Sequence, residues 1–139
     1  MKPGYAILDH PADMGIEARG ATLAQAFEQA AIALTSIIIE HSTVEPREQR
    51  KVAIEATDFE QLFVKWLTEI LYLYDGQHFV VCGATLHELL PTKLKATLSG
   101  EPFSSVKHSP KLDVKAITYH QLRIQANEDG GKITVYLDI

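Results

Sequence analysis

Cysteine is nearly absent from this chain, and long apolar runs are absent altogether. Cys82 is the only cysteine in 139 residues, which excludes an internal disulfide and a zinc site built from thiolates. No apolar run reaches the roughly 20 residues of a membrane-spanning helix, and the first residues lack the hydrophobic stretch of a signal peptide. We therefore expect a cytoplasmic protein that is not exported.

Several catalytic motifs are also missing. The sequence contains no G-x-x-x-x-G-K-[ST], G-x-G-x-x-G, G-x-S-x-G or H-E-x-x-H pattern, and these patterns cradle phosphates, expose a nucleophilic serine or hold zinc. Internal repeats and Ser- or Pro-rich linkers are missing as well. Residues 1–139 are therefore predicted to form a single domain, and a nucleotide-driven or nucleophilic enzyme has little support.

The charge is acidic overall but unevenly distributed. Thirteen Lys and Arg against eighteen Asp and Glu give a formal net charge of −5, which argues against general attraction to the phosphates of nucleic acid. Residues 91–123 nevertheless carry six basic and two acidic side chains. This basic stretch is either a solvated face of alternating strands or a binding patch.

The apolar pattern predicts an α+β fold. Two long helices, from Thr22 to about Ile38 and from about Asp58 to Tyr74, follow the 3.6-residue period, and the first is apolar on most faces. Strands are expected at 5–9, 14–19, 51–56, 78–88, 93–100, 115–127 and 132–138, with turns at Asp75-Gly76 and Asp129-Gly130-Gly131. The order β-β-α-β-α-β-β-β-β indicates mostly antiparallel sheets, with the helices packed against or between them.

The last strand brings two carboxylates together. Its alternation directs Thr134, Tyr136 and Asp138 to one face. If the strand is paired to its end, the α-carboxylate of Ile139 is held beside the carboxylate of Asp138. A third oxygen ligand such as Asp13, with a hard divalent cation (calcium, magnesium or manganese), would relieve their repulsion. The alternative is a solvated C-terminus with an Asp that only orders its turn.

Histidines and one lysine supply further candidates. His10 and Asp13, in H-x-x-D spacing, are either a partial metal site or a hydrogen-bonded turn. His108 and His120 either join a metal or act as acid and base near neutral pH, or they are ordinary surface or strand histidines. Lys115 opens the predicted strand 115–127, on the opposite face from His120, and is either solvated or holds an anionic group of a partner.

Five segments together resemble the archease family. LDHPAD (residues 8–13) resembles its D-H-T-A-D turn, and GATL (20–23) with AF (26–27) and AA (30–31) is similar to its first helix. WLTEILY (66–72) resembles its W-L-N-E-L-L-Y helix, VKAITYH (114–120) its V-K-A-[IV]-T-Y-H strand, and DI (138–139) its D-I terminus. The resemblance covers nearly the whole chain, although Pro11 stands where the family usually has Thr.

The resemblance implies a non-enzymatic activator of an RNA ligase. That ligase joins 2′,3′-cyclic-phosphate or 3′-phosphate ends to 5′-hydroxyl ends, as in tRNA splicing. Archease promotes the guanylylation of its active-site histidine by GTP and permits multiple turnovers. The metal carboxylates of the family fall on Asp13 and Asp138, with the terminal carboxylate of Ile139 as a further ligand, and its important strand lysine falls on Lys115. The family implies calcium as the ion.

Two other functions are consistent with the residues alone. A small metal-dependent phosphoester hydrolase would use His10, Asp13, His120 and Asp138 to activate a bound water. An RNA-binding module would use the basic stretch 91–123 and would bind RNA without the ligase, in a manner that weakens steeply with salt.

Overall fold

The chain folds into an α+β structure, as the sequence predicts. A computed structural model describes residues 1–9 and 13–139. The helices are α1 (Leu23–Ile38), the 3-10 helix η1 (His41–Thr43) and α2 (Phe59–Gln77). The strands are β1 (Gly4–Asp9), β2 (Met14–Gly20), β3 (Glu48–Glu55), β4 (Phe79–Leu90), β5 (Lys93–Pro102), β6 (Ala116–Ile117), β7 (Arg123–Asn127) and β8 (Gly130–Asp138). All pairings between these strands are antiparallel.

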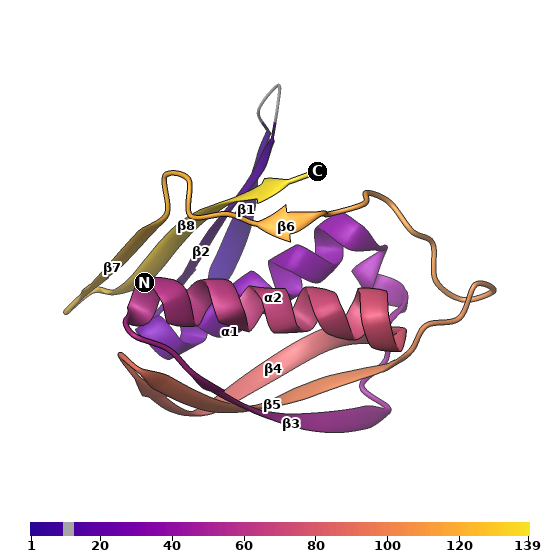
Figure 1. Cartoon of the computed structure of the whole chain (residues 1–139), viewed down its shortest axis with the longest axis horizontal. Coiled ribbons are helices and arrows are strands. Elements are labelled where there is room, and N and C mark those ends of the chain that lie inside the picture. The colour runs from indigo at the N-terminus through magenta and orange to yellow at the C-terminus, as the bar shows by residue number, and fades with distance from the viewer. Residues whose placement is uncertain (10–12) are drawn as a thin grey trace.

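Two sheets enclose the helices (Figure 1). One sheet has the order β1-β2-β8-β6, with β7 also paired to β8, and the other has the order β3-β5-β4. α1 contacts β1, β2 and β8 on one side and β4 on the other, and α2 contacts β3 and β4 as well as β6 and β7. The prediction of helices packed between sheets is therefore confirmed. No helix within the described residues is long and apolar enough to cross a membrane.

α1 forms the centre of the core. Its N-terminus is capped by Thr22, whose side-chain oxygen accepts a hydrogen bond from the Gln25 N–H at 3.2 Å. Because both faces of this helix meet a sheet, its small and large apolar residues are almost completely buried. These are Ala26, Phe27, Ala30, Ala31, Ala33, Leu34, Ile37 and Ile38.

The two helices are joined by a buried tryptophan. Trp66 on α2 is fully buried, and its indole Nε1–H donates to the backbone carbonyl of Phe27 on α1 at 2.9 Å. The Phe27 ring meets the Phe63 ring edge-on, with the ring centroids 5.1 Å apart. The two helices are therefore joined by a hydrogen bond with a defined geometry as well as by apolar packing.

α2 extends beyond its predicted end. It continues through Asp75 and Gly76, and the chain reverses at His78, which has a φ of 54° and donates its N–H to the Leu73 carbonyl. A Cβ atom at position 76 would lie 2.7 Å from a ring carbon of Tyr72. The prediction of a turn at Asp75-Gly76 is therefore wrong, because this glycine makes room for the Tyr72 ring within the helix.

The predicted strand 115–127 is two strands. β6 and β7 both pair with β8, but from Ile117 to Arg123 the chain advances six residues while their partners, Leu137 and Thr134, are only three apart. The extra residues leave the sheet in a turn where Gln121 has a φ of 53°. The prediction of one continuous strand is wrong because this change of register depends on β8, which is distant in sequence.

The hairpin predicted at Asp129-Gly130-Gly131 is confirmed. Asn127 pairs with Gly130, so Glu128 and Asp129 form a two-residue loop between β7 and β8. Gly130 has a φ of 137°, a conformation that side chains disfavour. β8 is thus fixed at its first residue and is paired on both sides, to β2 and to β6 and β7.

Candidate functional site

The register between β2 and β8 sets two predicted metal ligands opposite each other. Met14, the first residue of β2, pairs with Leu137. One further step in the same antiparallel register sets Asp13 against Asp138. Asp13 is half-buried and Asp138 is exposed. The two carboxylates, which are far apart in sequence, therefore lie at the same end of the five-stranded sheet.

The pairing of β6 brings the predicted lysine to the same end. Ala116 pairs with Asp138, and the Lys115 N–H donates to the Asp138 carbonyl at 2.7 Å. The same register sets Lys115 beside Ile139, which is 37% exposed. The backbone at the end of β8 is therefore held between β2 and β6.

Tyr136 shares a face of β8 with Asp138 and is largely buried, with only 9% of the residue exposed. A Cβ atom on Gly15 would lie 2.7 Å from a carbon of the Tyr136 ring, so the ring covers this glycine. The Thr118 N–H and hydroxyl both donate to the Tyr136 carbonyl, at 3.1 and 2.9 Å. The His120 ring meets the Tyr136 ring with centroids 6.4 Å apart. Strand alternation places Tyr136 on the face of Asp138, but its contact with Gly15 depends on the β2–β8 pairing.

The donors at this end of the sheet are suited to a hard divalent cation. They are the carboxylates of Asp13 and Asp138 and the terminal carboxylate of Ile139, and oxygen ligands suit calcium, magnesium or manganese. The Asp138 and Lys115 side chains have no hydrogen bond or ion pair with another described residue. The donors fit such an ion and would leave several of the roughly six to eight positions of calcium open to other oxygens.

The hydrolase alternative receives no support from the geometry. Within residues 1–9 and 13–139, no three His, Cys, Asp or Glu side chains are grouped so that they could hold a metal. His120 is exposed in the turn after β6, with its ring against Tyr136. His10 and Pro11 lie outside the described residues.

His108 belongs to a buried contact away from this site. Its ring accepts a hydrogen bond at Nδ1 from the Ser104 N–H at 2.9 Å, and its Nε2 lies 3.0 Å from Glu101 Oε2. Because Nδ1 is the acceptor, Nε2 carries the proton, and the Nε2–H group donates a hydrogen bond to the Glu101 carboxylate. His108 therefore fixes a loop structurally, and sequence reasoning missed its pairing with Glu101.

Glu101 is a buried carboxylate that is held ionised. Its side chain is only 4% exposed and lies 2.9 Å from Lys107 Nζ. Burial alone would raise the pKa of the Glu101 carboxyl, but hydrogen bonds from the Glu45 N–H, Lys107 and His108 outweigh it and lower the pKa to about 2. Glu101 thus joins the end of β5 to the loop that follows.

This pairing predicts an acid-sensitive component of stability. A carboxyl whose pKa is lower in the folded state stabilises the fold above its unfolded value, near 4.5, and loses that effect as the pH falls toward 2. We expect Glu101→Gln to lower the free energy of unfolding at pH 7 by about 1–3 kcal/mol and to flatten the pH dependence between these values. Urea unfolding from pH 7 to pH 2 measures both effects.

Glu128→Gln, in the exposed β7–β8 loop, is the control for this experiment. Identical pH profiles of the free energy of unfolding for Glu101→Gln and Glu128→Gln would contradict this account.

The connection from β5 to β6 carries Lys115 across the end of α1. The Lys111 and Leu112 N–H groups donate to the carbonyls of Ile38 and Ile37, at 2.8 and 3.2 Å. Lys111 Nζ donates to the Ser36 carbonyl at 2.9 Å. These bonds satisfy carbonyls at the C-terminus of α1, where a cation is favoured. Lys115 is therefore presented by a connection that is fixed to the core.

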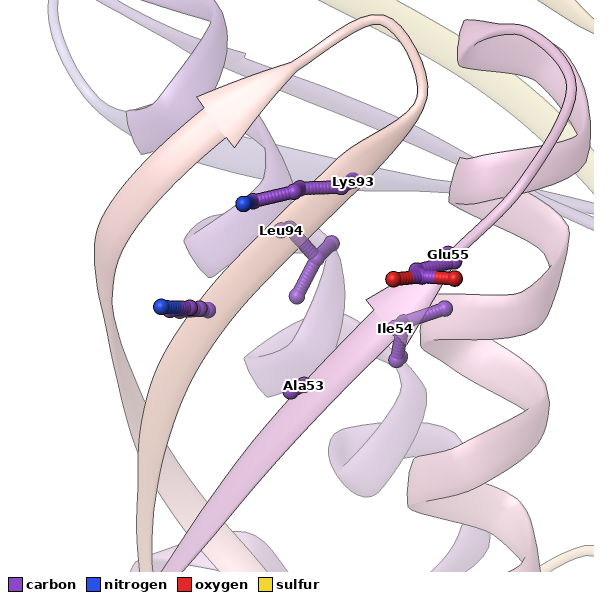
Figure 2. A pocket seen from close by; sticks show the side chains of 6 residues that line it. Ala53, Ile54, Glu55, Lys93 and Leu94 are labelled. Atoms are coloured by element: carbon purple, nitrogen blue, oxygen red, sulfur yellow. The ribbon is translucent and has the colours of Figure 1, made fainter.

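The basic stretch 91–123 does not form one surface. Lys93 and Lys95 lie on the three-stranded sheet, in a hollow of about 350 Å³ at the ends of β3 and β5 (Figure 2). Lys93 pairs with Glu55 in the sheet register, and its ammonium lies 3.3 Å from Glu88. Other members of the stretch bind Glu101, cap α1 or lie on the opposite sheet; these are Lys107, Lys111, Lys115 and Arg123. A continuous RNA-binding patch along this stretch is therefore not formed.

The sequence and the fold match one family of small α+β proteins. The family model described as "Archease protein family (MTH1598/TM1083)" matches residues 5–139. The chain belongs to the archease family. It is 35% identical over 139 residues to protein archease of Methanosarcina acetivorans, covering 97% of this chain and 95% of that protein. It is 40% identical over 126 residues to protein archease of Thermococcus gammatolerans, covering 88% of each.

Solved structures agree with this assignment. The solution structure of Methanobacterium thermoautotrophicum protein 1598 matches with a TM-score of 0.80 and 30% identity, covering 98% of this chain and 99% of that one. The crystal structure of an archease from Thermotoga maritima, described as a possible chaperone, matches with a TM-score of 0.65, covering 95% of this chain and 94% of that one. At 19% identity, this second match shows the fold alone.

Proposed function

We propose that this chain is a cytoplasmic activator of a GTP-dependent RNA ligase and acts through a divalent cation held at the end of β8. The ligase joins 3′-phosphate or 2′,3′-cyclic-phosphate RNA ends to 5′-hydroxyl ends, as in tRNA splicing. The chain promotes guanylylation of the active-site histidine of the ligase and permits multiple turnovers. Membership of the archease family supports this choice of partner. In this proposal the chain contacts the ligase directly and acts on RNA only indirectly, through the ligase.

One observation supports the proposal best: the register of β8 with its two neighbours. Asp13 is set against Asp138 on one side, and Lys115 is set beside Ile139 on the other. Strands fixed by pairing on both sides position charged groups more accurately than a mobile loop does. The end of β8 is therefore suited to presenting charge to a partner.

The residues at the end of β8 and beside it have different proposed roles. Asp13, Asp138 and the terminal carboxylate of Ile139 would hold the ion, with calcium proposed and magnesium or manganese as alternatives. A bound divalent cation would supply positive charge and open coordination positions for oxygens of the partner. Lys115 is set against Ile139, so its side chain leaves the opposite face of the sheet from Asp138. Its exposed ammonium adds a cation at this end of the sheet and is available to the partner, because no other described residue pairs with it.

The proposal is tested by RNA ligation with GTP in excess, with and without the chain. The ligase alone is expected to slow once the guanylylated enzyme present at the start has been used. With the chain present, product should continue to form until it exceeds the amount of ligase. Identical product yields with and without the chain would contradict the proposal. Phosphodiester turnover by the chain alone would contradict its non-enzymatic character.

A further inference from the structure

A groove lies on the outer face of the five-stranded sheet, next to the candidate metal site. Its volume is about 620 Å³, within the range of roughly 300–1,000 Å³ that is typical of small-molecule sites. It lies along β8 between β2 and the turn before β7. Its lining residues are Glu17, Gln121, Leu122, Arg123, Lys132, Thr134 and Tyr136. Tyr136 and Asp138 are alternate residues of β8 and so share this face.

Arg123 is the cation of this groove whose charge is not offset. It is exposed and pairs with Thr134 in the β7–β8 register, and it forms no ion pair with another described residue. Lys132 Nζ, by contrast, lies 3.8 Å from Glu17 Oε2, so these two charges offset each other. Because paired residues share a face of the sheet, Arg123 offers a planar guanidinium, which binds phosphate in bidentate fashion, on the same face as the Thr134 hydroxyl.

The wall of the groove is already formed. The turn between β6 and β7 is held by the Leu122 N–H, which donates to the Tyr119 carbonyl at 3.2 Å, and by the His120 N–H, which donates to the Thr118 hydroxyl at 3.3 Å. Gln121 keeps a left-handed φ of 53° at the top of this turn. A preformed wall lowers the ordering cost that a ligand must overcome.

We propose that this groove binds a nucleoside triphosphate through its phosphate groups, with Arg123 and Thr134 as the principal contacts. The groove is larger than a single phosphate requires. Its neighbour on the same face is the pair of carboxylates, Asp13 and Asp138. Magnesium, one of the ions considered for that pair, is commonly held by one or two carboxylates together with phosphate oxygens of a ligand.

The two parts of this proposal are independent. The metal-dependent part of the binding rests on the proposed function, because it needs an ion at Asp13 and Asp138. The contact with Arg123 does not need the ion. Binding is therefore measured on the isolated chain, without ligase, first in EDTA and then with calcium or magnesium.

The test is calorimetric titration of the chain with GTP, inorganic tripolyphosphate and guanosine. In EDTA, GTP and tripolyphosphate are expected to bind and guanosine is not. Arg123→Gln should weaken GTP binding by roughly tenfold or more, the value of a charge-assisted hydrogen bond. Glu17→Gln should strengthen it by about threefold, because it removes the half-buried anion that offsets the charge of Lys132 in the groove. Lys51→Gln, on the other sheet, is the matched control and should leave the affinity unchanged.

The opposite signs of the two groove variants separate binding from a loss of folding. Equal GTP affinities for the wild type and Arg123→Gln would overturn the proposal, as would guanosine binding as tightly as GTP. An RNA oligonucleotide that binds while GTP and tripolyphosphate do not would also overturn it. In the presence of the ion, affinity for GTP should rise in the wild type and not in Asp138→Asn. A failure of ligase stimulation, measured separately, would contradict the proposed function without affecting the result in EDTA.

Discussion

Asp138→Asn is expected to lower the affinity of the chain for calcium by at least about 100-fold, since groups that only orient a metal ligand are already worth about 10- to 100-fold. Asparagine keeps the size of the side chain but removes the negative charge. The Asp138 carboxylate is exposed and has no hydrogen bond or ion pair with another described residue, so its loss should not disturb the fold. Calcium titration followed by calorimetry measures the effect.

Asp129→Asn is the matched control for this experiment. It removes the same charge from the same hairpin, but from the loop that begins β8 rather than from the end of the strand. Its calcium affinity should equal that of the wild type. If both variants bound calcium equally well, the carboxylates at the end of β8 would not be the metal ligands.

Trp66→Ala is expected to give the largest loss of stability, about 3–5 kcal/mol, because it opens a cavity in the centre of the core. Trp66 is fully buried, and the substitution also removes its bond to the Phe27 carbonyl. For a domain whose total stability is typically about 5–15 kcal/mol, this loss is a large part of the whole. Urea unfolding of the purified variant measures it.

Two further variants separate the causes of that loss. Trp66→Phe keeps an aromatic ring but lacks the donor, so its loss should be smaller than that of the alanine variant. Tyr72→Ala removes an aromatic ring from the same helix at a position that is 52% exposed, and its loss should stay below about 1 kcal/mol. A larger loss for Tyr72→Ala than for Trp66→Ala would show that the helix interface is not the main source of stability.

The elements of the fold with strong local signals could be predicted from the sequence. The 3.6-residue period marks both helices, and the capping side chains at Thr22 and Asp58 mark where they begin. The division of residues 115–127 could not be predicted, because the segment contains no Gly or Pro and its register is decided by β8. The end of α2 at His78 was also not predicted. Asp75-Gly76 is locally typical of a turn, but in the structure Gly76 lies within the helix and leaves room for the Tyr72 ring one turn earlier.

The candidate site divides in the same way. Alternation along β8 predicts that Tyr136 and Asp138 share a face, because this depends only on neighbours in sequence. The meeting of Asp13 with Asp138 depends on a pairing between strands at opposite ends of the chain. The residues alone therefore offered Asp13 only as one candidate for a third ligand, and the family resemblance indicated it specifically. The burial of His108 against Glu101 depends on how residues 103–115 cross α1, which no local pattern encodes.

The measurement that tests the central claim most directly is guanylylation of the ligase by labelled GTP, with a divalent cation present, in the presence of the wild-type chain or its Asp138→Asn variant. The wild type and Asp129→Asn are expected to stimulate guanylylation equally, whereas Asp138→Asn should leave it at the level of the ligase alone. Full stimulation by Asp138→Asn would contradict the role assigned to the end of β8.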